Sequence, residues 1–103
     1  MSDDRRWCDL TILIPARNEA DGIERAIMAA KASAARLMAQ RDVETYEILV
    51  VDDASTDATP EILDGIAPHV PELRVVRNAV QRTLGGSLRA GFDAARGDLV
   101  LYT

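Results

Sequence analysis

Four short runs of apolar, often β-branched residues alternate along this chain with three segments of helical periodicity. The runs cover residues 10–14, 46–51, 73–76 and 99–102. Strands that alternate with helices build parallel sheets, because each helix carries the chain back over the sheet in a right-handed crossover. The alternation therefore predicts an α/β fold, a Rossmann-like parallel sheet with helices on both of its faces.

The helical segments carry different start and stop signals. The first spaces its apolar residues by three and four over residues 23–38. The second begins at Thr59 and Pro60, which fit an N-cap and a first helical residue. The third segment has its apolar residues on one face of the predicted helix: Leu84, Leu88, Phe92 and Ala95. Gly97 then stands where a C-terminal cap is expected.

The size and charge of the chain limit its organisation and its partners. Its 103 residues suffice for one domain or part of one, and we expect residues 1–8 to form a tail before a domain over residues 9–103. The formal net charge is −5, and the eleven Arg and one Lys are scattered. Nucleic-acid binding needs clustered basic residues, so we expect no nucleic-acid partner. The single cysteine, Cys8, cannot form an internal disulfide and fits a reducing cytoplasm.

The sequence stops at Thr103, one residue past the fourth predicted strand. An uncovered last strand would expose apolar side chains and unpaired backbone groups. We therefore expect a fragment that is truncated after the fourth strand and that self-associates through the exposed edge strand.

Ligands of open α/β sheets bind beyond the carboxyl ends of the strands. Three polar loops leave these ends, at residues 15–21, 52–59 and 77–86. In the first loop, Pro15 ends the strand and fixes the exit of the chain. Asn18 and Glu19 allow two interpretations, hydrogen bonds to ribose hydroxyls or capping of the following helix.

The second loop begins with two carboxylates, Asp52 and Asp53, directly after the second apolar run. A carboxylate here can accept a hydrogen bond from the imino N–H of uracil or guanine. The alternative is that Asp53, Ser55 and Asp57 form turns and cap the next helix. Adjacent side chains of an extended chain point in opposite directions, so we expect different roles for Asp52 and Asp53.

The third loop joins Arg82 to Gly85 and Gly86. Glycines at a helix start let the backbone approach phosphate oxygens, and an arginine can add a charge-assisted bond to a diphosphate. A flexible surface loop with a solvated arginine explains the same residues. The chain has no Gly-x-Gly-x-x-Gly after its first strand and no Walker-type loop, which argues against a dinucleotide-dependent dehydrogenase and a P-loop enzyme.

Three blocks of sequence occur in an order that is typical of one enzyme family. They are LIPARNE at residues 13–19, ILVVDDASTD at 48–57 and LGGSLRAGFDAARGD at 84–98. Together they closely resemble the opening of the family 2 inverting glycosyltransferases, and above all of members that load mannose or glucose onto polyprenyl phosphates. The resemblance covers nearly the whole chain from Leu10. It implies the N-terminal half of the A-type glycosyltransferase fold.

The resemblance implies a nucleotide pocket that draws on all three loops. Its residues are Pro15, Ala16, Glu19, Asp52, Asp53, Arg82, Gly85 and Gly86. Within this pocket, Asp52 and Asp53 would contact the base or ribose, and residues 82–86 would lie near the donor. The resemblance assigns neither a catalytic residue nor a metal ligand to this chain.

The resemblance also implies chemistry that these residues do not complete. The family uses a UDP- or GDP-sugar and transfers the sugar, with inversion, to a lipid phosphate or a saccharide. Its Asp-x-Asp motif, which holds Mg²⁺ or Mn²⁺ on the diphosphate, follows the fourth strand, and its general base lies further on. We therefore expect nucleotide recognition without activity, in the cytoplasm or at the cytoplasmic face of a membrane. The alternative is a non-catalytic nucleotide-binding module.

Overall fold

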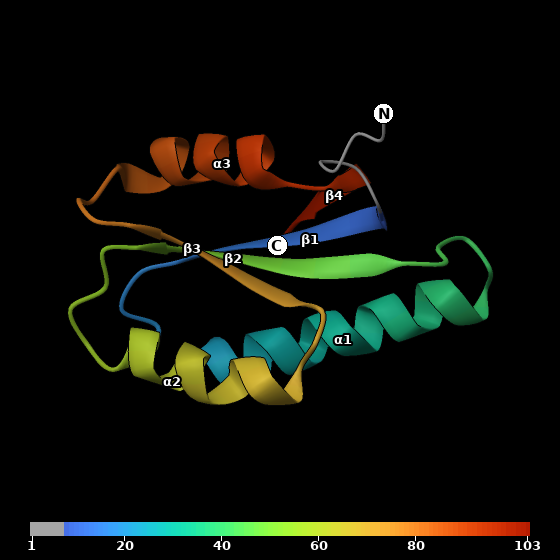
Figure 1. Cartoon of the computed structure of the whole chain (residues 1–103), viewed down its shortest axis with the longest axis horizontal. Coiled ribbons are helices and arrows are strands. Elements are labelled where there is room, and N and C mark those ends of the chain that lie inside the picture. The colour runs from blue at the N-terminus through green and yellow to red at the C-terminus, as the bar shows by residue number, and fades with distance from the viewer. Residues whose placement is uncertain (1–7) are drawn as a thin grey trace.

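The computed structural model of the protein describes residues 8–103, which form a parallel sheet between two layers of helices (Figure 1). The strands are β1 (Cys8–Ala16), β2 (Tyr46–Asp53), β3 (Leu73–Asn78) and β4 (Gly97–Tyr102). The helices are α1 (Ile23–Ala39), α2 (Thr59–Ile66) and α3 (Thr83–Ala94), with a short 3₁₀ helix η1 (Ala67–His69) after α2. The predicted α/β fold is confirmed. Residues 1–7 of the expected tail lie outside the described residues, and Cys8 already belongs to β1.

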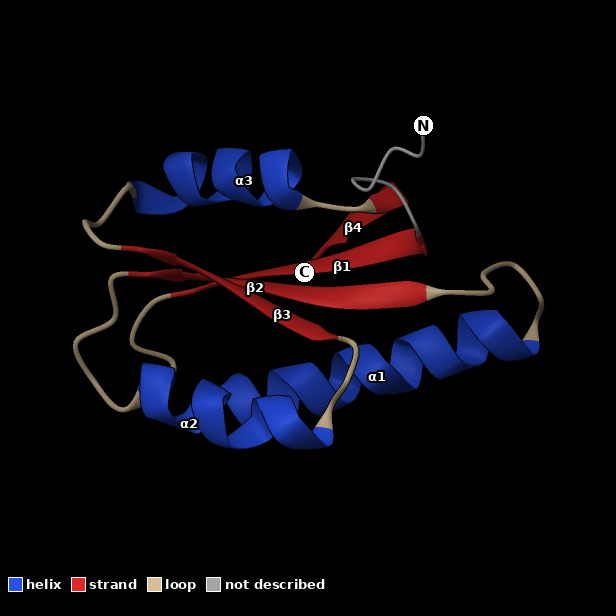
Figure 2. Ribbon diagram, viewed as in Figure 1, coloured by secondary structure: helices blue, strands red, loops and turns tan. Residues whose placement is uncertain are grey.

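The order of the strands places β1 inside the sheet although it comes first in the chain. The order is β3-β2-β1-β4, and each neighbouring pair is parallel. Helices α1 and α2 cover one face of the sheet and α3 covers the other (Figure 2). The chain thus builds outward from β1 to β3 and then returns to the other side of β1. Sheets of this type bind ligands at the carboxyl ends of the strands, near such a reversal.

Three strands continue past the residues at which the sequence predicted their ends, and β3 does so by two residues, to Asn78. β1 runs through Pro15, which stands opposite Val51 of β2. The pairing of β1 with β4 ends at Leu13, so the missing N–H of Pro15 removes no ladder bond on that side. β2 likewise includes Asp52 and Asp53, which were expected in a loop. The carboxylates of the candidate site therefore stand on a rigid strand.

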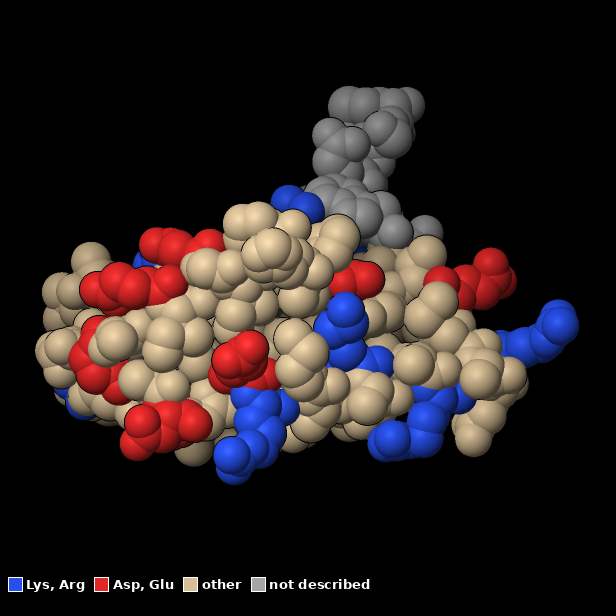
Figure 3. Space-filling view, turned by 90° about the horizontal axis from the view of Figure 1, so that it is seen from below, with Lys and Arg blue, Asp and Glu red and all other residues tan. Residues whose placement is uncertain are grey.

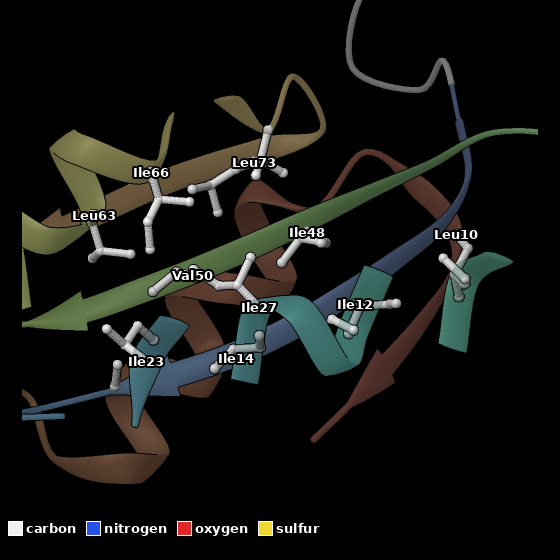
Figure 4. Close-up of a cluster of buried hydrophobic side chains, with 14 of the residues drawn as sticks. Leu10, Ile12, Ile14, Ile23, Ile27, Ile48, Val50, Leu63, Ile66 and Leu73 are labelled. Carbon is white, nitrogen blue, oxygen red and sulfur yellow. The ribbon is translucent and has the colours of Figure 1, made fainter. Parts of the chain in front are cut away.

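The larger part of the hydrophobic core lies between the sheet and the layer of α1 and α2 (Figure 4). The predicted periodicity of α1 is confirmed, because Ile23 and Ile27 point into this core and are fully buried. The strands contribute alternate residues such as Ile12 and Val50, and α2 adds Leu63. Each such side chain stabilises the fold by roughly 1.5–3 kcal/mol, so this layer fixes how β1 and β2 stand relative to α1 and α2.

The other face of the sheet is covered by α3 through small residues rather than through the apolar stripe predicted for it. Leu84 and Phe92 of that stripe are 56% and 52% exposed, while Leu88 and Ala95 are only partly buried. The buried residues of α3 are Ser87 and Gly91. A Cβ built on Gly91 would lie 2.4 Å from Leu13 Cδ1, so α3 approaches the sheet too closely for a larger side chain. Leu84 and Phe92 therefore face solvent, while Leu88 still packs against the buried cluster of Leu13, Leu49 and Val51.

Neither of the two predicted helix caps is found. Thr59 is the first residue of α2 rather than its cap, and its hydroxyl donates a hydrogen bond to Asp57 Oδ1 at 2.5 Å. Gly97 is the first residue of β4, and α3 ends earlier, at Ala94. A Cβ on Gly97 would lie 2.4 Å from the backbone nitrogen of Thr11. Glycine is needed there because β4 docks directly against the backbone of β1.

A buried polar network lies under α3, near the amino end of the sheet. Glu47 of β2 is buried, and its carboxylate accepts hydrogen bonds from Thr11 Oγ1 at 2.6 Å and from Arg74 Nη1 at 2.5 Å. The backbone N–H of Arg96 also donates to Glu47 Oε2, at 2.7 Å. Arg74 in turn donates to the carbonyl of Ala94, the last residue of α3. The network therefore joins the end of α3 to three strands of the sheet.

β4 forms one edge of the sheet and carries exposed apolar side chains. Leu99 is 65% exposed and Leu101 is 46% exposed. Leu101 also lines an apolar hollow against α1, together with Ala26, Ala30 and Ile12. The exposed edge strand predicted from the sequence is thus present in the fold.

Candidate functional site

Three loops meet at one edge of the sheet, because β1, β2 and β3 are parallel neighbours whose carboxyl ends lie together (Figure 1). They span residues 17–22, 54–58 and 79–82. Each loop, or the helix residue at its end, holds one non-glycine residue with a positive φ: Asn18 (54°), Ala54 (58°) and Thr83 (71°). Such conformations cost on the order of 1–3 kcal/mol each and persist only where neighbouring contacts impose them. The site is therefore built from strained loops whose shape depends on the contacts between them.

The first loop is tied to the second by side-chain hydrogen bonds. Asn18 Oδ1 accepts from the backbone N–H groups of Thr56 and Asp57, at 2.7 and 3.2 Å. The backbone N–H of Glu19 donates to Thr59 Oγ1 at 2.9 Å. Gly22 holds the N-cap position of α1 without any side-chain hydrogen bond, so the side chains of Asn18 and Glu19 do not cap that helix. The main-chain carbonyl of Glu19 does accept a hydrogen bond from the N–H of Ile23 at 2.8 Å, so the capping interpretation is wrong only for the side chains.

Asp52 stands at the end of β2, and only 2% of its surface is exposed. Its Oδ1 accepts hydrogen bonds from Ser55 Oγ at 2.5 Å and from the backbone N–H of Ser55 at 3.3 Å. Arg77 Nε lies 3.9 Å from the other oxygen, Oδ2. A buried carboxylate with one oxygen held by hydrogen bonds presents its second oxygen in a fixed direction.

Asp53 points the other way and binds the third loop. The two adjacent carboxylates therefore have different roles, as expected. Its Oδ1 accepts from Asn78 Nδ2 at 2.9 Å and from the backbone N–H of Arg82 at 2.8 Å. Burial acts to raise the pKa of Asp53, but the hydrogen bonds from Asn78, Arg82, Thr83 and Ser87 outweigh it and lower the pKa below 3.8. Asp53 is therefore an ionised anchor for the start of α3.

Asp57 confirms the turn interpretation for one residue of the second loop. Its Oδ1 accepts from the hydroxyl and from the backbone N–H of Thr59, and its Oδ2 accepts from the backbone N–H of Ala20 at 3.1 Å. The Thr59 hydroxyl is the largest cause that lowers the pKa of Asp57. The side chain thus shapes the second loop and also contacts the first.

The third loop brings the start of α3 to the site, but Gly85 and Gly86 do not line the hollow that lies beside this helix. Arg82 is exposed and directly precedes α3. Gly85 has no other group within 4 Å of a Cβ built on it, while a Cβ on Gly86 would contact Arg82 Cβ at 2.7 Å. The hollow beside this helix is lined instead by Thr83, Leu84 and Ser87, residues that sequence reasoning did not select.

Two adjoining hollows open between these loops. The first has a volume of about 330 Å³, within the range of about 300–1,000 Å³ that is usual for small-molecule sites. Of the residues selected from the sequence, it brings together Pro15, Ala16, Glu19 and Asp53. The second is lined by Asp52, with Ser55, Thr56, Arg77 and Asn78 among its other residues.

Arg17 and Gln81 line both hollows, and sequence reasoning assigned neither of them to the pocket. Arg77 was missed as well. One signal for Arg77 was available, since Arg77 and Asn78 end β3 as Asp52 and Asp53 end β2. No comparable signal marks Gln81, because its place depends on how the third loop folds back over the sheet.

The charge around the site is mainly negative. Figure 3 shows acidic side chains gathered at the end of the molecule where the strands finish, and basic side chains toward the middle and the opposite end. Arg17 and Arg77 line the hollows and Arg82 precedes α3, so the site itself carries charges of both signs. Within residues 8–103, no cluster of three or more His, Cys, Asp or Glu side chains is placed to hold a metal ion. Within the same residues, no helix has the length and apolar character needed to cross a membrane.

Comparisons with known proteins agree with this geometry. The sequence model of glycosyl transferase family 2 matches residues 11–103. The chain is 42% identical over 89 residues to succinoglycan biosynthesis protein ExoO of Rhizobium meliloti, covering 86% of this chain and 23% of that protein. It is 33% identical over 104 residues to undecaprenyl-phosphate 4-deoxy-4-formamido-L-arabinose transferase of Yersinia enterocolitica, covering 98% and 30%.

Solved structures show the same arrangement of strands and helices. Mannosyltransferase PcManGT from Pyrobaculum calidifontis, in complex with GDP-Man and Mn²⁺, matches with a TM-score of 0.68 and 27% identity, covering 92% of this chain and 28% of that chain. S. aureus TarS matches with a TM-score of 0.70 at 22% identity, over 92% of this chain and 26% of that chain, which shows likeness of fold alone. The expected A-type glycosyltransferase fold is confirmed, and the chain spans less than a third of each of these relatives. Because the family model matches nearly all of its residues, this chain belongs to glycosyl transferase family 2.

Proposed function

We propose that this chain recognises the nucleotide of a UDP- or GDP-sugar in a glycosyltransferase that acts with inversion on a polyprenyl phosphate or a saccharide. The main support for the proposal is the pair of hollows at the carboxyl edge of the sheet. Two of the loops whose sequences resemble the family line these hollows. In the reaction, the acceptor oxygen bonds to the anomeric carbon while the bond to the nucleoside diphosphate breaks. The diphosphate leaves with the electron pair, and a hydroxyl acceptor gives its proton to a base outside the described residues.

Asp52 is the residue that we assign to the base. Its Oδ1 is held by Ser55, and the contact of Oδ2 within the described residues is Arg77 Nε at the long distance of 3.9 Å. Oδ2 can therefore accept a hydrogen bond from an imino N–H in the second hollow. Uracil and guanine carry such a donor and cytosine does not, so the site should select UDP or GDP over CDP.

The other selected residues surround the ribose and the diphosphate. Pro15 and Ala16 form a wall of the first hollow, and the exposed carboxylate of Glu19 can accept from ribose hydroxyls. Arg82, Gly85 and Gly86 line neither hollow but stand at the start of α3 beside them, and we assign them to the diphosphate side. A helix N-terminus favours negative charge, which supports this assignment.

We also propose that the intact enzyme needs Mg²⁺ or Mn²⁺. The related mannosyltransferase PcManGT was solved with GDP-Man and Mn²⁺, which supports a divalent cation beside the diphosphate. Residues 8–103 do not fit a metal site by themselves. We therefore place the metal ligands outside the described residues. We also propose a location at the cytoplasmic face of a membrane. Two observations support it: one relative is named for undecaprenyl phosphate, and the single cysteine of this chain is free.

Calorimetric titration of the intact protein with UDP, GDP and CDP in the presence of Mn²⁺ tests the proposal. We expect binding of UDP or GDP, weaker binding of CDP, and loss of this difference in Asp52→Asn. Asp42→Asn is the matched control, because it removes the same charge from an exposed residue that follows α1. If the protein binds neither UDP nor GDP, the proposal is wrong. If it binds nucleotide but transfers no sugar from any donor, the chain is a non-catalytic binding module.

A further inference from the structure

Asn18 is bonded in a way that neither contact with a nucleotide nor helix capping explains. Its backbone is left-handed, with a φ of 54°, a conformation that asparagine tolerates better than most residues. Its side-chain Oδ1 accepts from three donors of the second loop: the N–H groups of Thr56 and Asp57 and the hydroxyl of Thr56. Both the backbone and the side chain of Asn18 therefore serve the contact between the two loops.

The same residue is connected to the carboxylate that we assign to the base. The backbone N–H of Asn18 donates to Ser55 Oγ at 2.9 Å, and the Ser55 hydroxyl donates to Asp52 Oδ1 at 2.5 Å. A hydroxyl that accepts on one side and donates on the other transmits the position of its donor to its acceptor. The first loop thus helps to set the direction in which Asp52 presents its second oxygen.

The other bonds between the two loops do not reach Asp52. Glu19 donates to Thr59, and Ala20 donates to Asp57, at the far end of the second loop. These bonds hold the first loop near α2 but leave the turn after Asp52 unsupported. Among the described residues of the first loop, Asn18 is the one bonded to Ser55 and Thr56.

We propose that Asn18 is a positioning residue for base recognition, acting through Ser55 on Asp52. This inference rests on the proposed function and goes beyond it, since it assigns base discrimination to a residue that makes no contact with the base. Loss of the Asn18 side chain keeps the backbone N–H bond to Ser55 but releases the N–H groups of Thr56 and Asp57, which loosens the turn at residues 54–57 and lets the Asp52 carboxylate rotate. The affinity for UDP or GDP then falls toward that for CDP, because only the former need a fixed carboxylate oxygen.

Three substitutions and one control separate the contributions of Asn18. Asn18→Gly keeps the left-handed backbone without strain but removes the acceptor. Asn18→Asp keeps an acceptor and tolerates the same backbone, with an added negative charge. Arg41→Gly is the control, since Arg41 has a φ of 63° but stands in the turn after α1, outside all three site loops. Ser55→Ala removes the connecting hydroxyl itself.

Two measurements on the intact protein test the inference. The first is amide hydrogen exchange at Thr56 and Asp57 without ligand, which we expect to become about tenfold faster in Asn18→Gly and to stay slow in Asn18→Asp and Arg41→Gly. The second is the ratio of CDP to UDP or GDP dissociation constants. We expect this ratio to fall about tenfold in Asn18→Gly and Ser55→Ala, to fall no further when the two are combined, and to survive in Asn18→Asp even if overall affinity drops.

The outcomes distinguish this inference from the proposed function. An unchanged ratio in a folded Asn18→Gly protein that still binds UDP or GDP overturns the inference and leaves the proposed function intact. Equal losses of discrimination in Asn18→Gly and Asn18→Asp also overturn it, because the acceptor would then be irrelevant. Failure of the wild-type protein to bind any nucleotide overturns both, and the exchange rates then show whether the loop contact itself exists.

Discussion

Replacement of glycine by alanine at two positions of α3 should change the stability of the protein in opposite directions. Gly91 faces the sheet, and a Cβ on it would lie 2.4 and 2.8 Å from the two methyl carbons of Leu13. Gly85 lies in the first turn of the same helix, and a Cβ on it would have no other group within 4 Å. Neither glycine has a positive φ, so alanine fits the backbone at both positions.

The magnitudes follow from two opposing effects. Alanine in place of glycine inside a helix stabilises it by about 0.5–1 kcal/mol. Gly85→Ala should therefore raise the free energy of unfolding by up to that amount. In Gly91→Ala the new methyl group overpacks the core, which costs about 1–3 kcal/mol. Leu13 is fully buried and has no room to move, so we expect the upper half of this range and a net loss of about 1–2 kcal/mol.

Urea denaturation and thermal unfolding of both variants measure the difference. For a domain of this size, the net loss in Gly91→Ala corresponds to a Tm lower by roughly 4–16 °C. A Gly91→Ala protein as stable as the wild type would refute the close approach of α3 to β1. Gly85→Ala carries a second readout: if Gly85 admits a diphosphate to the backbone, this variant gains stability but loses nucleotide affinity.

Four further results are expected. Asp53→Asn should lower the free energy of unfolding by about 1–2 kcal/mol at pH 7. Because the folded-state pKa of Asp53 is lowered, its contribution is full above the unfolded-state value and is lost as pH falls through the folded-state pKa, so urea titrations of wild type and variant should converge below pH 3.8. Glu47→Gln, which leaves Arg74 without a charged partner among residues 8–103, should cost about 2–3 kcal/mol in the same assay. Removal of divalent metal by a chelator should weaken UDP or GDP binding, and Mn²⁺ should restore it. Sedimentation velocity should show concentration-dependent association that Leu99→Lys suppresses; a monomer at all concentrations would exclude pairing through β4.

The fold could be predicted from the sequence because local patterns of residues indicate most of its strands and helices. The apolar runs give the strands, and the spacing of Ile23 and Ile27 gives the buried face of α1. The buried face of α3 could not be found in the same way. Its packing depends on Gly91, which has no side chain to contribute to an apolar pattern, and on how near the helix comes to Leu13. How closely two elements approach each other depends on the tertiary structure, and the spacing of apolar residues along the sequence does not indicate it.

The site was only partly predictable for a related reason. The sequence shows that polar residues follow each strand, and the rule for parallel sheets brings them to one edge. It does not show which polar groups bind one another across loops. Asn18 could bond a ribose, a helix or another loop with the same chemistry, and only the fold brings Thr56 within its reach. Arg17 and Gln81 likewise gain their place in the hollows from the path of the backbone.

The inner position of β1 has a consequence for synthesis of the protein. β1 leaves the ribosome before the other three described strands, and β2 can pair with one of its sides soon afterwards. Its other side waits for β4, which begins roughly 80 residues later. At a synthesis rate of about 5–20 residues per second, this side of β1 stays unpaired for roughly 4–16 seconds. During this interval the nascent chain presents a bare strand edge beside Leu10 and Ile12, and this is the stage at which a chaperone that binds extended apolar segments would protect it.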